Sequence, residues 1–172
     1  MSDKIKIVKK AIESIKGGEL RFQRGVFKSG CEVCALGVLF VSLLRTEGED
    51  VDRTIHSRHR IFQGMSDHWS EVQLHAIEEA FENGFCGAVP RYVEETETEI
   101  IGRHALLTAG PSHPLWCVME ARVWGLRTRR ENGGNVEKVG LAILENMLQN
   151  EGNFLPPAVS AEEAREVLGS KV

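Results

Sequence analysis

Apolar residues along most of this chain recur at the three- and four-residue spacing of a helix with one buried face. The first such set is Ile5, Val8, Ile12 and Ile15. This spacing is typical of an amphipathic helix. Asp3 is placed to cap its start, since a short acidic side chain can accept a hydrogen bond from the first backbone N–H groups. The glycine pair at 17–18 is expected to end the helix.

The segment Ala35 to Leu44 has a different pattern, because every residue in it except Ser42 is apolar or glycine. A helix that is hydrophobic all round has no face for solvent and is typically buried. The pattern therefore predicts a buried central helix near 34–45.

Start and stop signals predict further helices downstream. Ser70 and Gln73 have the spacing of a capping box, with Trp69 and Leu74 placed as a hydrophobic staple around it. We expect that helix to end at Asn83-Gly84, another to start at Pro114, and a third to follow the break at 132–134. Ser160 and Glu163 repeat the capping box before a short final helix.

Extended structure is predicted in two short stretches only, near 20–28 and near 91–101, where apolar and polar residues alternate or the helical pattern breaks. No linker or internal repeat divides the chain. The fold class predicted is mainly α, with α+β as the alternative, in a single domain over residues 1–172.

Composition and charge narrow the class of protein. Of the 172 residues, 42% are hydrophobic and 27% charged, which is ordinary for a globular domain. The net charge of −4 gives no general attraction for nucleic acid. The longest apolar run, Val33 to Leu44, is about twelve residues, whereas a membrane span needs about twenty. The charged N-terminus lacks the core of a signal peptide, so we expect a cytoplasmic protein with reduced cysteines and no membrane partner.

Two cysteines in CxxC spacing, together with two nearby histidines, suggest a zinc site. The four residues are Cys31, Cys34, His56 and His59. Two thiolates and two imidazoles are a ligand set that tetrahedral Zn²⁺ prefers. The gap of about 21 residues between the pairs is longer than a usual finger loop. The favoured interpretation is therefore that no cofactor is bound, that Cys34 packs in the core, and that His59 shares an apolar stripe with Phe62.

A second hypothesis makes one of these cysteines a nucleophile. A thiol at a helix N-terminus has its pKa lowered by the helix dipole, and either Cys31 or Cys34 is placed for this role. Histidine partners would be His104 or His113, but neither has an orienting Asn or Asp beside it. Phosphate loops, GxGxxG turns, HExxH and GxSxG are all missing, so the usual nucleotide-binding, zinc-protease and hydrolase classes are disfavoured.

Arginines and a tryptophan gather in one segment, which is the candidate binding site. Its residues are Arg122, Trp124, Arg127, Arg129 and Arg130. Arginine and tryptophan are enriched at interface hot spots and also contact phosphates and bases. The alternative is a solvated helix face, with Gly125 weakening any long helix across the segment. The glutamates in 94–99 are the acidic counterpart, interpreted as an exposed strand or loop.

The cysteine motif and a later helix carry a resemblance to a known group. Gly30-Cys31, the run Cys34-Ala35-Leu36-Gly37-Val38-Leu39 and the run from Gln73 to Phe81 resemble small phage- and prophage-encoded proteins of unknown function. The resemblance covers about a third of the chain. It implies a mobile-element accessory protein that acts on a bacterial host or its defences.

The function expected is that of a non-catalytic protein that binds, and inhibits, a host protein in the bacterial cytoplasm. The alternative is a small cysteine-dependent enzyme, or a protein that binds a nucleotide or phosphate ligand through Cys31 or Cys34 and the arginines of 122–130. Nucleic acid is a secondary candidate partner. Whether the chain is an enzyme stays open, with the missing motifs favouring no catalysis.

Overall fold

Helices make up most of the structure, a computed structural model that describes residues 2–49, 51, 54–55, 57–82 and 105–169. The mainly α fold class predicted from the sequence is confirmed. The long helices are α1 (Asp3–Lys16), α2 (Ala35–Thr46), α3 (Arg58–Met65), α4 (Glu71–Glu82), α6 (Trp116–Glu131), α7 (Val136–Gln149) and α8 (Ala161–Gly169). Residues 105–109 are also helical, and the 3-10 turn η2 (Gly110–Ser112) follows them.

The predicted central helix is confirmed as α2. Every residue from Ala35 to Leu44 is buried, and α2 contacts α1, α3, α4 and α7. Its N-terminal turn also packs closely on the preceding loop, since a Cβ on Gly37 would overlap the carbonyl group of Phe27. Only glycine fits at that position.

A small sheet precedes α2. It contains β1 (Arg21–Phe22), β2 (Lys28–Ser29) and β3 (Glu32–Val33) in the order β1-β3-β2. The pair β1 and β3 is parallel, and β2 runs antiparallel to β3. This confirms extended structure near 20–28, whereas the stretch predicted at 91–101 lies outside the described residues.

The start of α1 differs from the prediction. Ser2 is the N-cap, and its hydroxyl accepts a hydrogen bond from the Ile5 N–H. Asp3 is the first helical residue and instead accepts a hydrogen bond from Lys6 Nζ at 2.9 Å. The buried stripe is rotated from the one expected, so Ile5 is only half-buried. Its buried members are Ile7, Val8, Ala11, Ser14 and Ile15.

At the start of α4, half of the predicted capping box forms. Ser70 Oγ accepts a hydrogen bond from the Gln73 N–H at 3.3 Å. The Gln73 side chain turns the other way and exchanges two 3.0 Å hydrogen bonds with the backbone of Phe154. Trp69 Nε1 donates to the Gly152 carbonyl at 2.7 Å. Hydrogen bonds from Trp69 and Gln73 at the start of α4 therefore hold residues 152–154, which follow α7, in place. The end predicted at Asn83-Gly84 lies outside the described residues.

The predicted starts of α6, α7 and α8 agree with the structure to within two residues. Asn135 caps α7 after the glycine break, and Ser160 and Glu163 form the complete capping box of α8, with hydrogen bonds of 3.1 and 2.8 Å. Helix α6 begins at Trp116, two residues after Pro114, and runs unbroken through Gly125.

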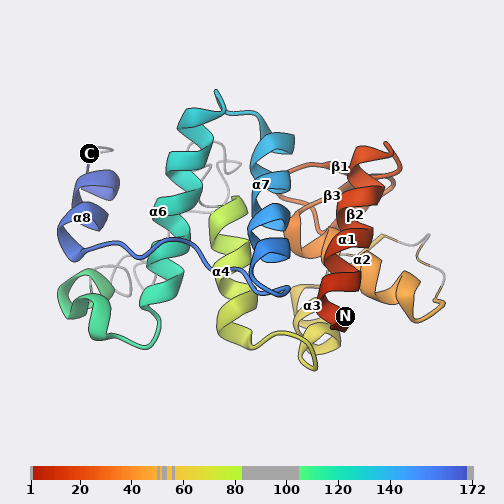
Figure 1. Cartoon of the computed structure of the whole chain (residues 1–172), viewed down its shortest axis with the longest axis horizontal. Coiled ribbons are helices and arrows are strands. Elements are labelled where there is room, and N and C mark those ends of the chain that lie inside the picture. The colour runs from red at the N-terminus through yellow and green to blue at the C-terminus, as the bar shows by residue number, and fades with distance from the viewer. Residues whose placement is uncertain (1, 50, 52–53, 56, 83–104, 170–172) are drawn as a thin grey trace.

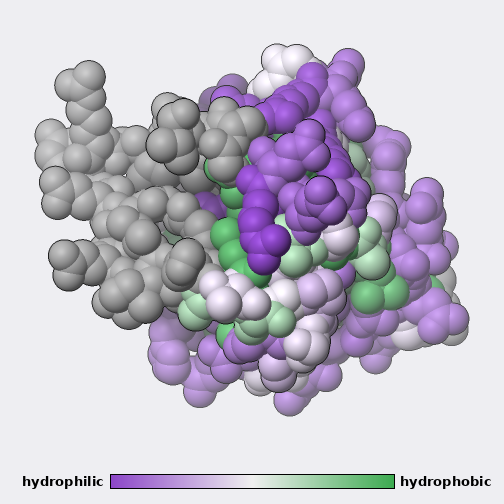
Figure 2. Space-filling view, turned by 90° about the vertical axis from the view of Figure 1, so that its left-hand side faces the viewer, coloured by the Kyte–Doolittle hydropathy of each residue, from purple (hydrophilic) through white to green (hydrophobic). Residues whose placement is uncertain are grey.

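Buried apolar residues of the described ranges form two clusters. The larger is built mainly from α1, α2, α3, α4 and α7, and the smaller from α6, α8 and the chain before α8. The long axis of the molecule runs from α8 at one end, through α6, to α1 and α2 at the other (Figure 1). Viewed from the α8 end, a strip of apolar surface lies beside a largely polar surface (Figure 2). No helix in the described part of the chain is long and apolar enough to cross a membrane.

Candidate functional site

Cys34 is a buried capping residue. It precedes the first residue of α2, and its Sγ accepts a hydrogen bond from the Gly37 N–H at 3.3 Å. Burial, with a further contribution from the charge of Glu82, raises the pKa of Cys34 to about 12. A nucleophilic cysteine needs the opposite shift. Cys34 therefore packs in the core as the simpler interpretation predicted, and it lacks the reactivity that the nucleophile hypothesis requires.

Among the described residues, the others proposed for cysteine or zinc chemistry do not gather around Cys34. Cys31 and His59 are exposed, so His59 does not share a buried stripe. His113 Nδ1 accepts a hydrogen bond from the Leu115 N–H in its own turn. The positions of His56 and His104 lie outside the described residues. Within the described ranges, no three His, Cys, Asp or Glu side chains are grouped to hold a metal ion.

The structure separates the residues of the arginine segment instead of presenting them as one surface. Arg122 is buried and forms an ion pair with Glu79 at 3.4 Å, between α6 and α4. Trp124 is half-buried, and its ring meets that of Phe154 edge-on at 5.3 Å. Arg127 forms a 3.4 Å ion pair with Glu163 of α8.

Arg127 and the last turn of α6 leave this segment open to solvent, since the Arg127 side chain is 43% exposed. Arg130 is exposed and Arg129 is half-buried, and both lie in the last turn, where positive charge complements the helix dipole. The glutamates of 94–99 lie outside the described residues. Arg122 and Trp124 thus pack within the fold, and the candidate contact surface of the segment is reduced to Arg127, Arg129 and Arg130.

A different arginine stands at the centre of an ordered surface cluster between α3 and α4. The first residue of α3, Arg58, forms hydrogen bonds with both carboxylate oxygens of Glu78, the shortest being 2.6 Å. These hydrogen bonds raise the pKa of the Arg58 guanidinium. Its Cζ also lies 4.3 Å from the ring centre of Phe62, one turn later in α3. Arg58 is thereby held in one orientation although its side chain is 44% exposed.

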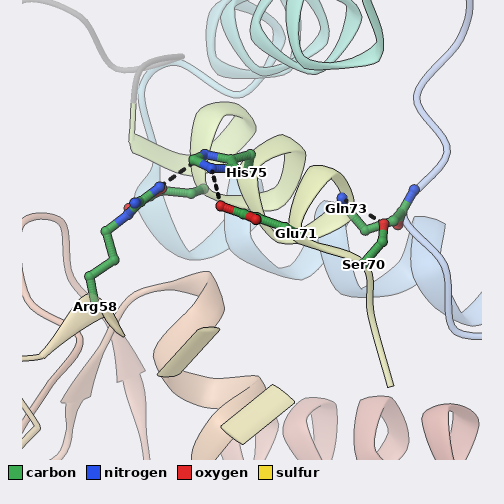
Figure 3. Close-up of polar contacts among 6 residues, drawn as sticks. Arg58, Ser70, Glu71, Gln73 and His75 are labelled. Carbon is green, nitrogen blue, oxygen red and sulfur yellow. Dashed lines mark hydrogen bonds and ion pairs between the residues drawn. The ribbon is translucent and has the colours of Figure 1, made fainter. Parts of the chain in front are cut away.

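His75 extends this cluster along α4. Arg58 Nη2 lies 2.9 Å from His75 Nδ1, and Glu71 lies 3.7 Å from His75 Nε2 on the other side of the ring, as Figure 3 shows. A guanidinium can only donate, so Nδ1 accepts and the proton of the neutral ring is on Nε2, facing Glu71. The His75 ring also packs edge-on against Phe62 at 5.1 Å.

An apolar groove of about 440 Å³ lies beside these residues. Buried Trp69 and Leu74 form part of the groove lining. Half-buried Phe62 lines the groove and also contacts Arg58. Its other lining residues are His59, Gln63, Ser66 and Glu71. We call the groove together with Arg58, His75 and Glu78 the α3–α4 site.

The α3–α4 site was missed in the sequence, although part of its signal was there. Arg58 and Phe62, like Glu71 and His75, are four residues apart, a spacing that brings side chains together on one helix. What the spacing could not show is that side chains of the two helices meet, since that contact depends on the tertiary fold.

Comparisons with known proteins add no further assignment. A scan of protein-family models, a search of curated proteins and a search of solved structures found no match to this chain.

Proposed function

We propose that this chain is a non-catalytic accessory protein of phage or mobile-element origin, which binds and inhibits a bacterial host protein through the α3–α4 site. The supporting observation is the cluster of Arg58, Phe62 and His75, held in place at the edge of an apolar groove.

This arrangement suits a protein interface for a physical reason. Interface energy is concentrated in a few aromatic and arginine residues beside well-packed pockets. Ordering a long side chain on binding costs about 0.5–1.5 kcal/mol, and Glu78 and Phe62 already order Arg58 in the free protein. The groove offers space for an apolar side chain of the partner next to this ordered polar rim.

The environments of Cys34, Arg122 and Arg127 favour a binding protein over an enzyme that uses these residues. The buried Cys34 thiol has its pKa raised to about 12, and Arg122 and Arg127 form ion pairs within the chain. A cysteine-dependent enzyme built on Cys34 would need that thiol to be reactive, which leaves exposed Cys31 as the cysteine for this alternative.

Site-directed photo-crosslinking in bacterial lysate tests the proposal. A photoreactive amino acid at Gln63, on the groove, should capture one host protein in near-stoichiometric yield. The double variant Arg58→Ala, Phe62→Ala should raise the dissociation constant for that protein at least about 10-fold, a loss of about 1.4 kcal/mol or more, as measured by crosslinking yield over a dilution series. The same photoreactive residue at exposed Lys138 of α7 is the control and should not capture it.

Two results would contradict the proposal. One is equal capture from positions 63 and 138, and the other is capture at position 63 that the double variant leaves unchanged while circular dichroism shows both proteins folded. A host enzyme captured in this way is then assayed with and without the chain, and unchanged activity would limit the function to binding.

A further inference from the structure

Lys28 is a buried lysine with few partners. It lies in β2 and is 4% exposed. Its Nζ donates one hydrogen bond, to the Gly30 carbonyl at 3.2 Å, and no carboxylate in the described part of the chain forms an ion pair with it. An ammonium has three N–H donors and is costly to bury unless its charge is compensated. The hydrogen bond to Gly30 uses one of these N–H groups, and the other two can donate to a bound ligand.

A polar pocket of about 360 Å³ lies beside Lys28. The turn between β2 and β3 forms one side, with Gly30 and exposed Cys31, and the end of α2 forms another, with Arg45. The pocket is independent of the α3–α4 site, since the two have no lining residue in common.

Arg45 presents a second cation to this pocket in a fixed position. Its Nη1 donates to Glu19 Oε2 at 3.0 Å and to Ser14 Oγ at 3.2 Å. Glu19 is thus compensated by Arg45, while the other acid of the pocket, Glu49, is exposed and its charge is screened by water. Lys28 is the buried charged residue of this pocket, and no carboxylate among the described residues forms an ion pair with it.

We propose that this pocket binds a small oxyanion, a carboxylate or phosphate group, with Lys28 Nζ and the Arg45 guanidinium as its charged donors. Hydrogen bonds between ionised partners are roughly twice as strong as those between neutral ones. A bound oxyanion would accept hydrogen bonds from the remaining Lys28 donors and offset its positive charge, so binding should stabilise the folded protein.

Thermal unfolding in matched salts tests this proposal. At equal ionic strength, 10 mM phosphate or succinate should raise the unfolding midpoint over chloride by about 3 °C if the dissociation constant is about 1 mM. Lys28→Met keeps the side-chain length without the charge. It should unfold at a higher midpoint than the natural protein in chloride and lose the response to phosphate and succinate.

Controls separate binding from a general salt effect. Phosphate stabilises many proteins by exclusion from their surface, so Lys138→Met, which removes an exposed lysine of α7, should keep the full response. Amide NMR of the unaltered protein should show saturable shifts centred on Lys28, Gly30, Cys31 and Arg45. A response to only one of the two anions identifies the group that is bound. Equal midpoints in all salts, an unchanged response in Lys28→Met, or shifts without saturation would overturn the proposal.

Discussion

Gly125 in α6 lies directly against the backbone of Ala80 in α4. A Cβ built on Gly125 would come within 2.2 Å of the Ala80 carbonyl oxygen, far inside any van der Waals contact. Helices α4 and α6 also make the most extensive contact between elements of the described chain. A glycine at this crossing lets the two backbones approach, and α4 carries one wall of the α3–α4 site.

Gly125→Ala should therefore destabilise the protein. In an exposed helix the same change stabilises by up to about 1 kcal/mol, but here the added methyl group must push α4 and α6 apart. We expect a loss of about 2 kcal/mol or more in the free energy of unfolding, measured by urea denaturation. Glu145→Ala, at an exposed position of α7, is the control and should change stability by less than about 0.5 kcal/mol. A stabilised Gly125→Ala protein would show that the helices do not meet at this point.

The sequence predicted individual helices better than their contacts. The caps at Ser70 and Ser160 and the buried run of α2 are local signals, because a few neighbouring residues determine them. From the sequence alone Gly125 is expected to weaken a long helix, because glycine has a low helix propensity. Its contact with the Ala80 carbonyl depends on the fold and has no signal in the sequence. Gln73 likewise fits a capping box locally, yet its side chain bonds to Phe154, 81 residues away.

Leu39→Ala should show how much the buried helix α2 contributes. Leu39 is completely buried, and truncating such a leucine leaves a cavity, so we expect a loss of about 2–5 kcal/mol by urea denaturation. Lys138→Ala, on the exposed face of α7, should change stability by less than about 0.5 kcal/mol. Similar midpoint shifts in both variants would place the core elsewhere.

Glu82 should make stability depend on pH near neutrality. Both its carboxylate oxygens accept from the Gly25 N–H, at 3.3 and 3.2 Å, and the charge of Arg24 lowers its pKa while that of Glu78 raises it. Burial raises the pKa of Glu82 from 4.5 to about 7. Since the folded protein then binds this proton more tightly, the stabilising contribution is complete below about pH 4.5 and is lost as the pH rises through about 7. The loss is about 3 kcal/mol.

Glu82→Gln isolates that contribution, because glutamine resembles the neutral carboxyl group. The stability of the variant relative to the natural protein, from urea denaturation at several pH values, should rise between pH 5 and pH 8 by about 3 kcal/mol. Glu145→Gln, exposed on α7, should show no comparable change over that range. A difference that stays constant with pH would mean that Glu82 has an ordinary pKa.

The cysteines offer a direct test of the assignment of Cys34 to the core. In native protein at pH 7.5, N-ethylmaleimide should modify exposed Cys31 quickly and buried Cys34 at least about 100-fold more slowly, because only the thiolate reacts and burial raises the pKa of Cys34 to about 12. Peptide mass spectrometry measures both rates. In urea the two rates should converge, and fast labelling of native Cys34 would restore the nucleophile hypothesis.

The candidate site was harder to predict than the helices, because it depends on contacts between segments that are distant in the sequence. Arginine and tryptophan are neighbours in the sequence at 122–130, but successive residues of a helix point in different directions. Arg122 and Trp124 therefore turn towards α4 and Phe154. The surface cluster around Arg58 instead combines two helices, whose contact no short motif encodes.

Two arginine variants distinguish structural from surface roles within α6. Arg122 has a side chain that is 10% exposed and is paired with Glu79, which is 20% exposed, so Arg122→Ala leaves a carboxylate that is largely buried without this partner. We expect a loss of about 1.5–3 kcal/mol in the free energy of unfolding, as for a hydrogen bond to a charged group. Arg130→Ala, in the exposed last turn, should cost less than about 0.5 kcal/mol. If Arg130→Ala then leaves crosslinking from position 63 unchanged, the arginine segment acts through the fold. If it abolishes crosslinking while the protein stays folded, the end of α6 belongs to the binding surface.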